Sequence, residues 1–182
     1  MDNFICSPES MGISSYKLIK LVNELSKHCS MHDLKVVRNE KTVLECCWAP
    51  FDGRKHVLNS FAKSVNVLAV GMAVEEGLLS LEDKPAEMFK DLLPEKYDPR
   101  VLKITVRDLL RMTSGSVGLS TDFNTAKGSW ITHYFSYPVP NEPGTKFMYE
   151  SGASFMLSAM VSKVYGKTVF DLLSSAYLNL WI

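Results

Sequence analysis

The feature of this sequence that most limits its fold is a nearly apolar segment, residues 61–76. Apolar side chains would surround a helix built from this segment: Phe61, Val65, Val67, Leu68, Ala69, Val70, Met72, Ala73 and Val74. A helix without a polar face is typically buried on every side. Gly77 follows where a left-handed C-terminal cap is expected. The rest of the chain is therefore expected to surround this helix.

The residues before this helix predict one more helix and a hairpin. Ser14 or Ser15 can cap a helix whose apolar side chains share one stripe: Leu18, Leu21, Val22 and Leu25. Two β-rich runs follow, residues 34–38 and 42–48, and the polar residues 39–41 separate them. This pattern predicts a β-hairpin. A hairpin alone is marginally stable, so the side chains of one face need partners, namely Val36, Val43 and Trp48.

The residues after the apolar helix predict further helices and one long loop. We expect a short helix at 85–89 and three helices capped in turn by Thr105, Ser151 and Thr168. Asp108 lies three residues after Thr105, as in a capping box. Residues 113–144 are rich in glycine and proline and are expected to form a loop, and long irregular segments are often functional. The last helix is expected to continue to the C-terminus.

Composition narrows the class of function before any motif is considered. The chain carries 20 Lys plus Arg and 20 Asp plus Glu, so no basic surface for nucleic acid is indicated. It has no run of about 18 apolar residues that would predict a membrane span. Residues 1–10 also lack the apolar core of a secretory signal. We expect a cytoplasmic protein with neither a nucleic-acid nor a membrane partner.

The histidines and cysteines do not indicate a metal site, and no cofactor is expected. The histidines do not group at metal-ligand spacings: His28, His32, His56 and His133. Glycine loops of the kind that bind phosphate are absent from the sequence. The cysteines form no CxxC pair: Cys6, Cys29, Cys46 and Cys47. Free thiols in a reducing compartment are the expected state.

The residue pair that could carry chemistry is Ser60 with Lys63, at the start of the apolar helix. A spacing of three places both side chains on one helix face, one turn apart. A serine hydroxyl is a weak nucleophile that needs a base within hydrogen-bond reach. Lysine can be that base where burial disfavours its ammonium form. The N–H groups at the start of a helix can also stabilise an oxyanion beside Ser60.

The spacing alone does not decide the role of these residues. Ser14 and Lys17 have the same spacing on an amphipathic surface helix. The alternative for the first pair is that Ser60 caps its helix and Lys63 extends to solvent. A Tyr-x-Ser/Asn pattern also occurs three times, beginning at Tyr134, Tyr149 and Tyr177. Of these, Tyr149 lies between a Pro-Gly turn and a capped helix, where side chains can converge on a cleft.

Four ordered blocks of sequence resemble one family. They are VVRNEKTVLECCWAPFDGRKHVLNSFAKSV, AVGMAVEEGLLSLED, ITVRDLLRMTSG and EPGTKFMYESGASFMLSAMVSKVYGKTVFDLL. Together they resemble the N-terminal portion of the serine β-lactamase-like hydrolases. This family includes class C β-lactamases, DD-peptidases, lipolytic esterases and 6-aminohexanoate-dimer hydrolases. The resemblance covers about residues 8–182.

The resemblance implies a chemistry for three residues. Ser60 would be acylated by an ester or amide substrate, Lys63 and Tyr149 would share the proton transfers, and water would then deacylate the enzyme. The Ser60 N–H would supply half of an oxyanion hole. Ser151 would contact substrate at the position where the family commonly has asparagine, although a hydroxyl lacks the amide's simultaneous donor and acceptor.

Two further departures from the family pattern affect these expectations. Methionine stands at position 112, where the family usually has histidine, and we expect this change to alter packing only. The family's final motif, a Lys-Thr-Gly or His-x-Gly strand, does not occur in the 182 residues. That strand lines the cleft and donates the second oxyanion N–H. The substrate-selecting strands are absent with it, so no particular substrate is predicted.

These observations predict an incomplete α+β fold of the β-lactamase/transpeptidase type. A helical region would pack beside the first two strands of an antiparallel sheet. We expect one partial domain, 1–182, with an N-terminal helix and hairpin, 1–60, followed by the nucleophile helix and helical region, 61–182. The predicted function is hydrolysis of an ester or amide, including a β-lactam, impaired without the second half. The alternatives are a non-catalytic penicillin-recognition or regulatory module and an inactive truncated product. Self-association through the incomplete sheet is also expected.

Overall fold

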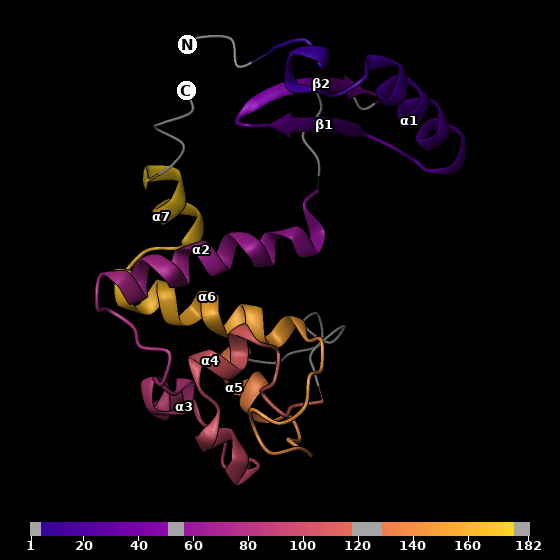
Figure 1. Ribbon diagram of the computed structural model, residues 1–182. Coiled ribbons are helices and arrows are strands. Elements are labelled where there is room, and N and C mark those ends of the chain that lie inside the picture. Colours follow the sequence, from indigo (N-terminus) through magenta and orange to yellow (C-terminus); the bar gives the residue numbers. More distant parts are fainter. Residues whose placement is uncertain (1–4, 51–56, 118–128, 177–182) are drawn as a thin grey trace. The chain divides into compact units, whose positions relative to one another are not determined.

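The computed structural model describes residues 5–50, 57–117 and 129–176 and divides the chain into two compact units, Met1–Val57 and Leu58–Ile182 (Figure 1). The first unit contains η1 (Glu9–Met11), α1 (Ser15–His28), β1 (Asp33–Arg38) and β2 (Lys41–Cys47). The second unit contains η2 (Asn59–Phe61), α2 (Ala62–Glu75), α3 (Pro85–Met88), η3 (Lys90–Leu92), η4 (Pro99–Lys103), α4 (Val106–Leu110), α5 (Trp130–Phe135), α6 (Ser151–Tyr165) and α7 (Val169–Ala176). The division falls close to the predicted boundary at residue 60.

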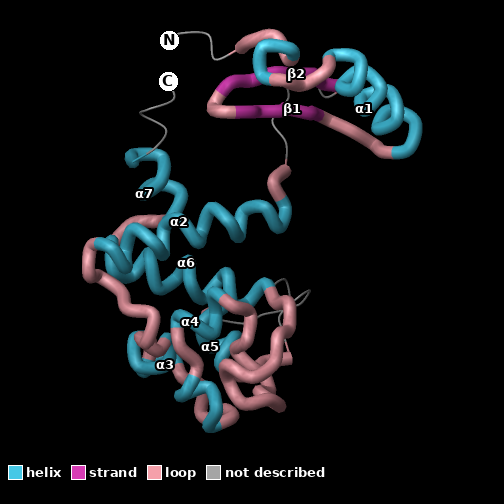
Figure 2. The backbone as a smooth tube through the Cα atoms, viewed as in Figure 1, coloured by secondary structure: helices cyan, strands magenta, loops and turns pink. Residues whose placement is uncertain are grey.

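The hairpin of the first unit agrees with the predicted one. β1 and β2 pair antiparallel in a two-stranded sheet, with an irregularity in register between Val36 and Val37. The turn residues Asn39 and Glu40 both have positive φ, 49° and 64°, as a two-residue hairpin loop requires. Ile5 adds an isolated parallel bridge to Thr42. Among the described residues, strands occur only in this unit (Figure 2).

α1 begins at the predicted place, but a different side chain supports its start. Ser14 is the N-cap residue and makes no side-chain cap bond. The Glu9 carboxylate instead accepts hydrogen bonds from the Ser15 N–H at 2.8 Å and the Ser15 hydroxyl at 3.0 Å. These bonds lower the pKa of Glu9. At the other end of the helix, the Trp48 indole N–H donates to Ser26 Oγ at 2.8 Å, which ties α1 to the end of the hairpin.

The apolar segment forms α2 and is buried on one side only. Ala69, Val70 and Ala73 are buried against the second unit's core, whereas Phe61 and Leu68 remain 66% and 57% exposed. The prediction of burial on every side is therefore wrong for this structure. The reason is that α6, along one face of α2 (Figure 1), and α7 cover only part of the helix surface within the second unit. Gly77 closes the helix with φ of 70°, as predicted.

The uncovered face of α2 borders an apolar pocket. The pocket has a volume of about 680 Å³ and lies among α2, α6 and α7. Its walls include Leu58, Ala62, Leu68, Val169, Phe170 and Leu173. Phe170 is 75% exposed at its rim. The second unit thus exposes apolar side chains beside this helix.

The helices around α6 form one hydrophobic core. Its fully buried side chains come from five elements and include Ile104, Val106, Leu109, Phe135, Met156, Met160 and Val161. Thr105 and Asp108 form the predicted capping box at the start of α4. The Asp171 N–H donates to Thr168 Oγ1 at 3.1 Å, so the cap of α7 is confirmed as well. The predicted end of this helix lies outside the described residues.

Two expectations for the second unit are wrong. The segment 113–144 is not loop throughout, because α5 forms inside it and buries Tyr134 and Phe135. Ser151 does not cap α6, because it is the first helical residue and Glu150 is the N-cap residue. Tertiary packing decides both points: the two aromatic rings enter the core, and the Glu150 side chain is buried instead of being left free at a helix end.

A loop ladder links residues 112–117 to residues 138–148. The Val117 N–H donates to Pro138 O, Gly144 to Thr113 O, and Met148 to Met112 O. Gly115 lies in the middle of this ladder with φ of 80°. A Cβ atom there would come within 2.2 Å of the Asn141 carbonyl oxygen. Only glycine can therefore occupy this position without moving the opposing backbone.

Gly115→Ala should consequently destabilise the protein more than Gly77→Ala. Both glycines have positive φ, which costs about 1–2 kcal/mol for another residue. Nothing lies within 4 Å of a Cβ added at Gly77, so the matched variant measures this conformational cost alone. At Gly115 the backbone clash should add about 1–3 kcal/mol. Urea unfolding of both variants measures the difference. Equal losses in the free energy of unfolding for the two variants would show that the loop ladder rearranges around the added Cβ atom at no energetic cost.

Candidate active site

Ser60 lies in the 3-10 turn that leads into α2, and its hydroxyl is the centre of a small polar cluster. The Tyr149 hydroxyl donates to Ser60 Oγ at 2.7 Å, and Lys63 Nζ donates to the same oxygen at 3.3 Å. Asn59, directly before Ser60, has φ of 48°, a conformation that asparagine adopts more readily than most residues. The three residues predicted to work together are thus in hydrogen-bond contact.

Lys63 lies in the first turn of α2, directly after the 3-10 turn that holds Ser60. One helical turn separates it from Ser60, and its ammonium group lies 5.1 Å from the centre of the Tyr149 ring. Its side chain is half-buried. The expectation of apolar neighbours on all sides of Lys63 is therefore not met, because α2 itself is covered on one face only.

Tyr149 comes from the segment just before α6, ninety residues along the chain from Asn59. Its side chain is 53% exposed. Hydrogen bonding with Ser60, and next with Lys63, lowers the pKa of the Tyr149 hydroxyl. The physical reason is that a hydroxyl and an ammonium group can both donate to the phenolate oxygen, which stabilises the ionised form.

The other two tyrosine patterns have different surroundings. Tyr134 is 2% exposed and belongs to the core. Burial raises the pKa of its hydroxyl well above the usual value. Tyr177 lies outside the described residues. Of the two described patterns, Tyr149 is thus the one in contact with Ser60.

The predicted substrate-binding residue, Ser151, is half-buried at the first position of α6. Within the described residues, no hydrogen bond joins its side chain to Ser60, Lys63 or Tyr149. Ser151 therefore lies at the start of α6, two residues after Tyr149, and is not hydrogen-bonded to the cluster within the described residues. Its predicted role stays a prediction.

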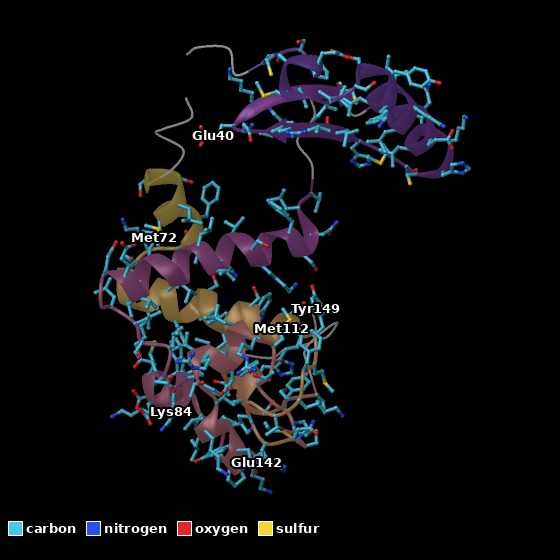
Figure 3. The ribbon with its side chains drawn as sticks, in the orientation of Figure 1. Glu40, Met72, Lys84, Met112, Glu142 and Tyr149 are labelled. Carbon is cyan, nitrogen blue, oxygen red and sulfur yellow. The ribbon has the colours of Figure 1, made fainter. Side chains whose placement is uncertain are left out.

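Met112, the departure from the family's histidine, lies near the start of α6 together with Tyr149 (Figure 3). It has φ of 54° and its carbonyl accepts from the Met148 N–H at 2.9 Å. Its side chain helps line a cavity of about 30 Å³ with Lys63 and Ser154. Met112 therefore contributes both to packing beside Lys63 and to the backbone placement of the residue before Tyr149.

Two polar contacts that support the cluster were not predicted from the sequence. Asn66, one turn after Lys63, donates to the Ser154 carbonyl at 3.1 Å and to its Oγ at 3.0 Å, which joins α2 to α6. The buried Glu150 accepts a hydrogen bond from Ser114. The sequence contains a signal for both contacts. Asn66 lies inside an apolar helix and Glu150 directly follows the candidate tyrosine, and a polar side chain that is buried at such a position normally has a hydrogen-bond partner.

Two searches of the described residues bear on other classes of site. Across residues 5–50, 57–117 and 129–176, no group of three His, Cys, Asp or Glu residues could hold a metal ion. In the same ranges, no helix has the length and apolarity that crossing a membrane requires. All four cysteines have free thiols.

Comparisons with known proteins find solved structures with a similar fold and a family model that matches this sequence. A 6-aminohexanoate-dimer hydrolase, described as "putative", from Bacillus anthracis has a TM-score of 0.71 at 18% identity over 86% of this chain. A similarly described β-lactamase from Bacteroides dorei has a TM-score of 0.74 at 22% identity over 91%. The octameric penicillin-binding protein homologue from Pyrococcus abyssi has a TM-score of 0.66 at 21% identity over 92%. The chain covers 46%, 52% and 43% of these three proteins, about half of each.

These likenesses define the class of fold as β-lactamase/transpeptidase-like, as predicted, over about half the length of the solved relatives. The family model described as "Beta-lactamase" matches residues 35–180. This chain belongs to that family. The match includes the apolar helix, the loop ladder and all three residues of the polar cluster, so the predicted family membership is confirmed.

The contact between Ser60 and Tyr149 should be measurable without any substrate. Ser60→Ala should raise the pKa of Tyr149 towards its ordinary value, because the hydrogen bond with Ser60, the main interaction that stabilises the phenolate, is lost. Carbon-13 labelling of the tyrosine ring at Cζ, with Tyr149→Phe to assign the signal, allows the titration to be followed by NMR. Ser64→Ala, on the same helix, is the control. An unchanged Tyr149 pKa in Ser60→Ala would contradict the observed geometry.

Proposed function

We propose that this protein is the nucleophile-bearing part of a serine hydrolase that cleaves an ester or amide through an acyl-enzyme on Ser60. The observation that carries the proposal is the pair of hydrogen bonds that Ser60 Oγ receives, from Tyr149 at 2.7 Å and from Lys63 at 3.3 Å. Two ionisable groups of different chemistry converge on one hydroxyl, which is the arrangement that an activated serine requires. Membership of the β-lactamase family supports the same class of reaction.

The proton path follows from the positions of these groups. In the ground state Ser60 Oγ accepts from both neighbours, so one neighbour must be deprotonated before it can take the serine proton. The lowered pKa of Tyr149 favours the phenolate as that base, with the Lys63 ammonium beside it. Ser60 Oγ then attacks the carbonyl carbon, and the proton passes to the leaving alcohol or amine. A water molecule repeats the sequence to release the acid and regenerate Ser60.

Stabilisation of the oxyanion is the incomplete part of this site. Ser60 lies at the start of a helix run, where backbone N–H groups are available to a developing negative charge. The family motif that would add a second donor is missing from the 182 residues. One oxyanion donor contributes about 2.7–4 kcal/mol to the transition state. We therefore expect the chain alone to turn over substrate slowly.

A second candidate function uses the same cluster without turnover. A protein that is acylated by a β-lactam and then fails to deacylate would act as a recognition module. The serine at position 151 favours this alternative, because a hydroxyl lacks the simultaneous donor and acceptor of the family's asparagine. Persistence of the acyl-enzyme separates the two functions: a hydrolase clears it, and a recognition module retains it.

Covalent labelling tests the proposed nucleophile. A fluorophosphonate probe should label the protein at Ser60, and Ser60→Ala should abolish the label. Ser14→Ala is the matched control, because Ser14 has the same spacing to a lysine but lies in the first unit. Peptide mass mapping identifies the modified residue. Label that survives in Ser60→Ala would overturn the proposal, and a wild-type protein that never reacts would leave the inactive-product reading as the better one.

The same assay measures the two proposed bases. Lys63→Ala and Tyr149→Phe should each slow labelling by roughly two to four orders of magnitude, the usual effect of losing a positioned general base. Tyr97→Phe, an exposed tyrosine outside the cluster, should leave the rate unchanged. Tyr134→Phe is a weaker control because that side chain is buried in the core.

We also propose that the protein self-associates through its exposed apolar surface. Leu68 on α2 and Phe170 beside the neighbouring pocket are exposed, and within the described residues the sheet has two strands with one isolated bridge to Ile5. Leu68→Glu combined with Phe170→Glu should reduce self-association, whereas Tyr16→Glu, an exposed position on α1, should not. Size-exclusion chromatography with light scattering gives the mass. A wild-type protein that is monomeric at all concentrations would contradict this proposal.

A further inference from the structure

Glu150 is a buried acid directly beside the candidate base. Its exposure is 1%, against 53% for its neighbour Tyr149. The backbone of Glu150 is extended, with φ of −141° and ψ of 142°. Successive side chains of an extended backbone point to opposite sides. The same local geometry that sends Tyr149 to Ser60 therefore sends Glu150 into the core.

The Glu150 carboxyl group meets hydroxyl groups inside the core. Ser114 Oγ donates to Glu150 Oε1, and Ser114 Oγ itself accepts from the Ser116 N–H at 3.1 Å. Glu150 Oε2 and the Tyr134 hydroxyl are both buried without a partner at hydrogen-bond geometry within the described residues. Burial raises the pKa of Glu150, and the Ser114 and Tyr134 hydroxyls only partly oppose this effect.

The charged groups around Glu150 do not favour its ionised form. Asp108 of α4 and Glu150 both raise the pKa of the adjacent Tyr134, because their negative charges disfavour a phenolate. Among the described residues, no salt bridge pairs Glu150 with a lysine, arginine or histidine. A buried carboxylate without a cation is costly, whereas a protonated carboxyl group can accept from Ser114 and donate from its other oxygen.

Tyr149 is consequently held from both sides by the same segment. The Met148 N–H donates to Met112 O at 2.9 Å, and two residues later Glu150 bonds Ser114. Met112 and Ser114 both belong to the loop ladder at 112–117. Residues 148 and 150 are thus anchored to positions two apart on one rigid turn. The residue between these anchors can keep one direction of approach to Ser60.

We propose that Glu150 is a positioning residue that holds the Tyr149 hydroxyl against Ser60 by anchoring the entry of α6 to Ser114. The inference deepens the proposed function, because its predicted effect on rate rests on Ser60 being acylated. Its effect on the Tyr149 contact rests on the observed geometry alone. The hydrogen-bonding shape of the group matters here and its negative charge does not, so an amide of the same shape should serve.

Three variants separate this role from simple core packing. Glu150→Gln keeps the shape and one donor, Glu150→Leu removes all hydrogen bonding at similar size, and Ser114→Ala removes the partner. Glu95→Leu, at an exposed glutamate, is the control. Circular dichroism and thermal unfolding establish that each variant is folded. If Glu150→Leu does not fold, Ser114→Ala carries the test, because it removes a single oxygen.

The first readout is the pKa of Tyr149 by carbon-13 NMR, which needs no activity. Glu150→Leu and Ser114→Ala should raise it towards the ordinary tyrosine value, as Ser60→Ala does, while Glu150→Gln should leave it low. A Tyr149 pKa that is unchanged in folded Glu150→Leu or Ser114→Ala overturns the inference. A rise in Glu150→Gln as large as in Glu150→Leu overturns it too, because the shape of the group would then not suffice.

The second readout is the fluorophosphonate reaction, resolved into the affinity for the probe and the maximal rate of labelling. Glu150→Leu should lower the maximal rate by about 10²-fold, the scale for a catalytic group displaced by roughly 1 Å, with little change in probe affinity. Equal losses in affinity and rate would indicate general damage to the fold and overturn the inference. Failure of the wild-type protein to react overturns the proposed function instead, and the Tyr149 titration still decides the role of Glu150.

Discussion

The close packing of α2 against α6 is the interaction on which the rest of the second unit depends. Small side chains make it possible: Ala69 and Ala73 on α2 and Ala153 on α6 are each fully buried. Asn66 adds two hydrogen bonds to Ser154 across the same contact. Because Ser60 and Lys63 lead into one helix and Tyr149 leads into the other, this packing sets the distance between the nucleophile and its partners.

The loop ladder completes what the helix pair begins. Two helices fix the relative position of their axes, but a tyrosine just before α6 could still point in several directions. The ladder between 112–117 and 138–148 removes that freedom, and Gly115 permits it because any Cβ would strike the Asn141 carbonyl. The buried Glu150 is tied to the same turn. The candidate site therefore depends on an irregular segment that a secondary-structure description would record as loop.

The family match and the contacts at Ser60 both support the proposed hydrolase chemistry. The polar cluster brings a serine, a lysine and a tyrosine into hydrogen-bond contact, the groups that the proposed acyl transfer requires. The chain spans about half the length of the solved proteins it matches. One face of α2 and the pocket beside it are correspondingly open to further apolar contact.

The sequence by itself determined the local structure, the family and the three residues of the cluster. The hairpin around Asn39 and Glu40, the capping box at Thr105 and the cap at Gly77 follow from short-range preferences, so they could be read without the fold. Tertiary structure decided what depends on distant partners. It left one face of the apolar helix exposed, drew α5 into a segment expected to be loop, and made the buried Glu150 the N-cap residue of α6 in place of Ser151. The physical reason is that the final burial of a side chain and its hydrogen bonds depend on residues far apart in the chain, such as Ser114 with Glu150, and periodicity along the sequence does not identify those partners.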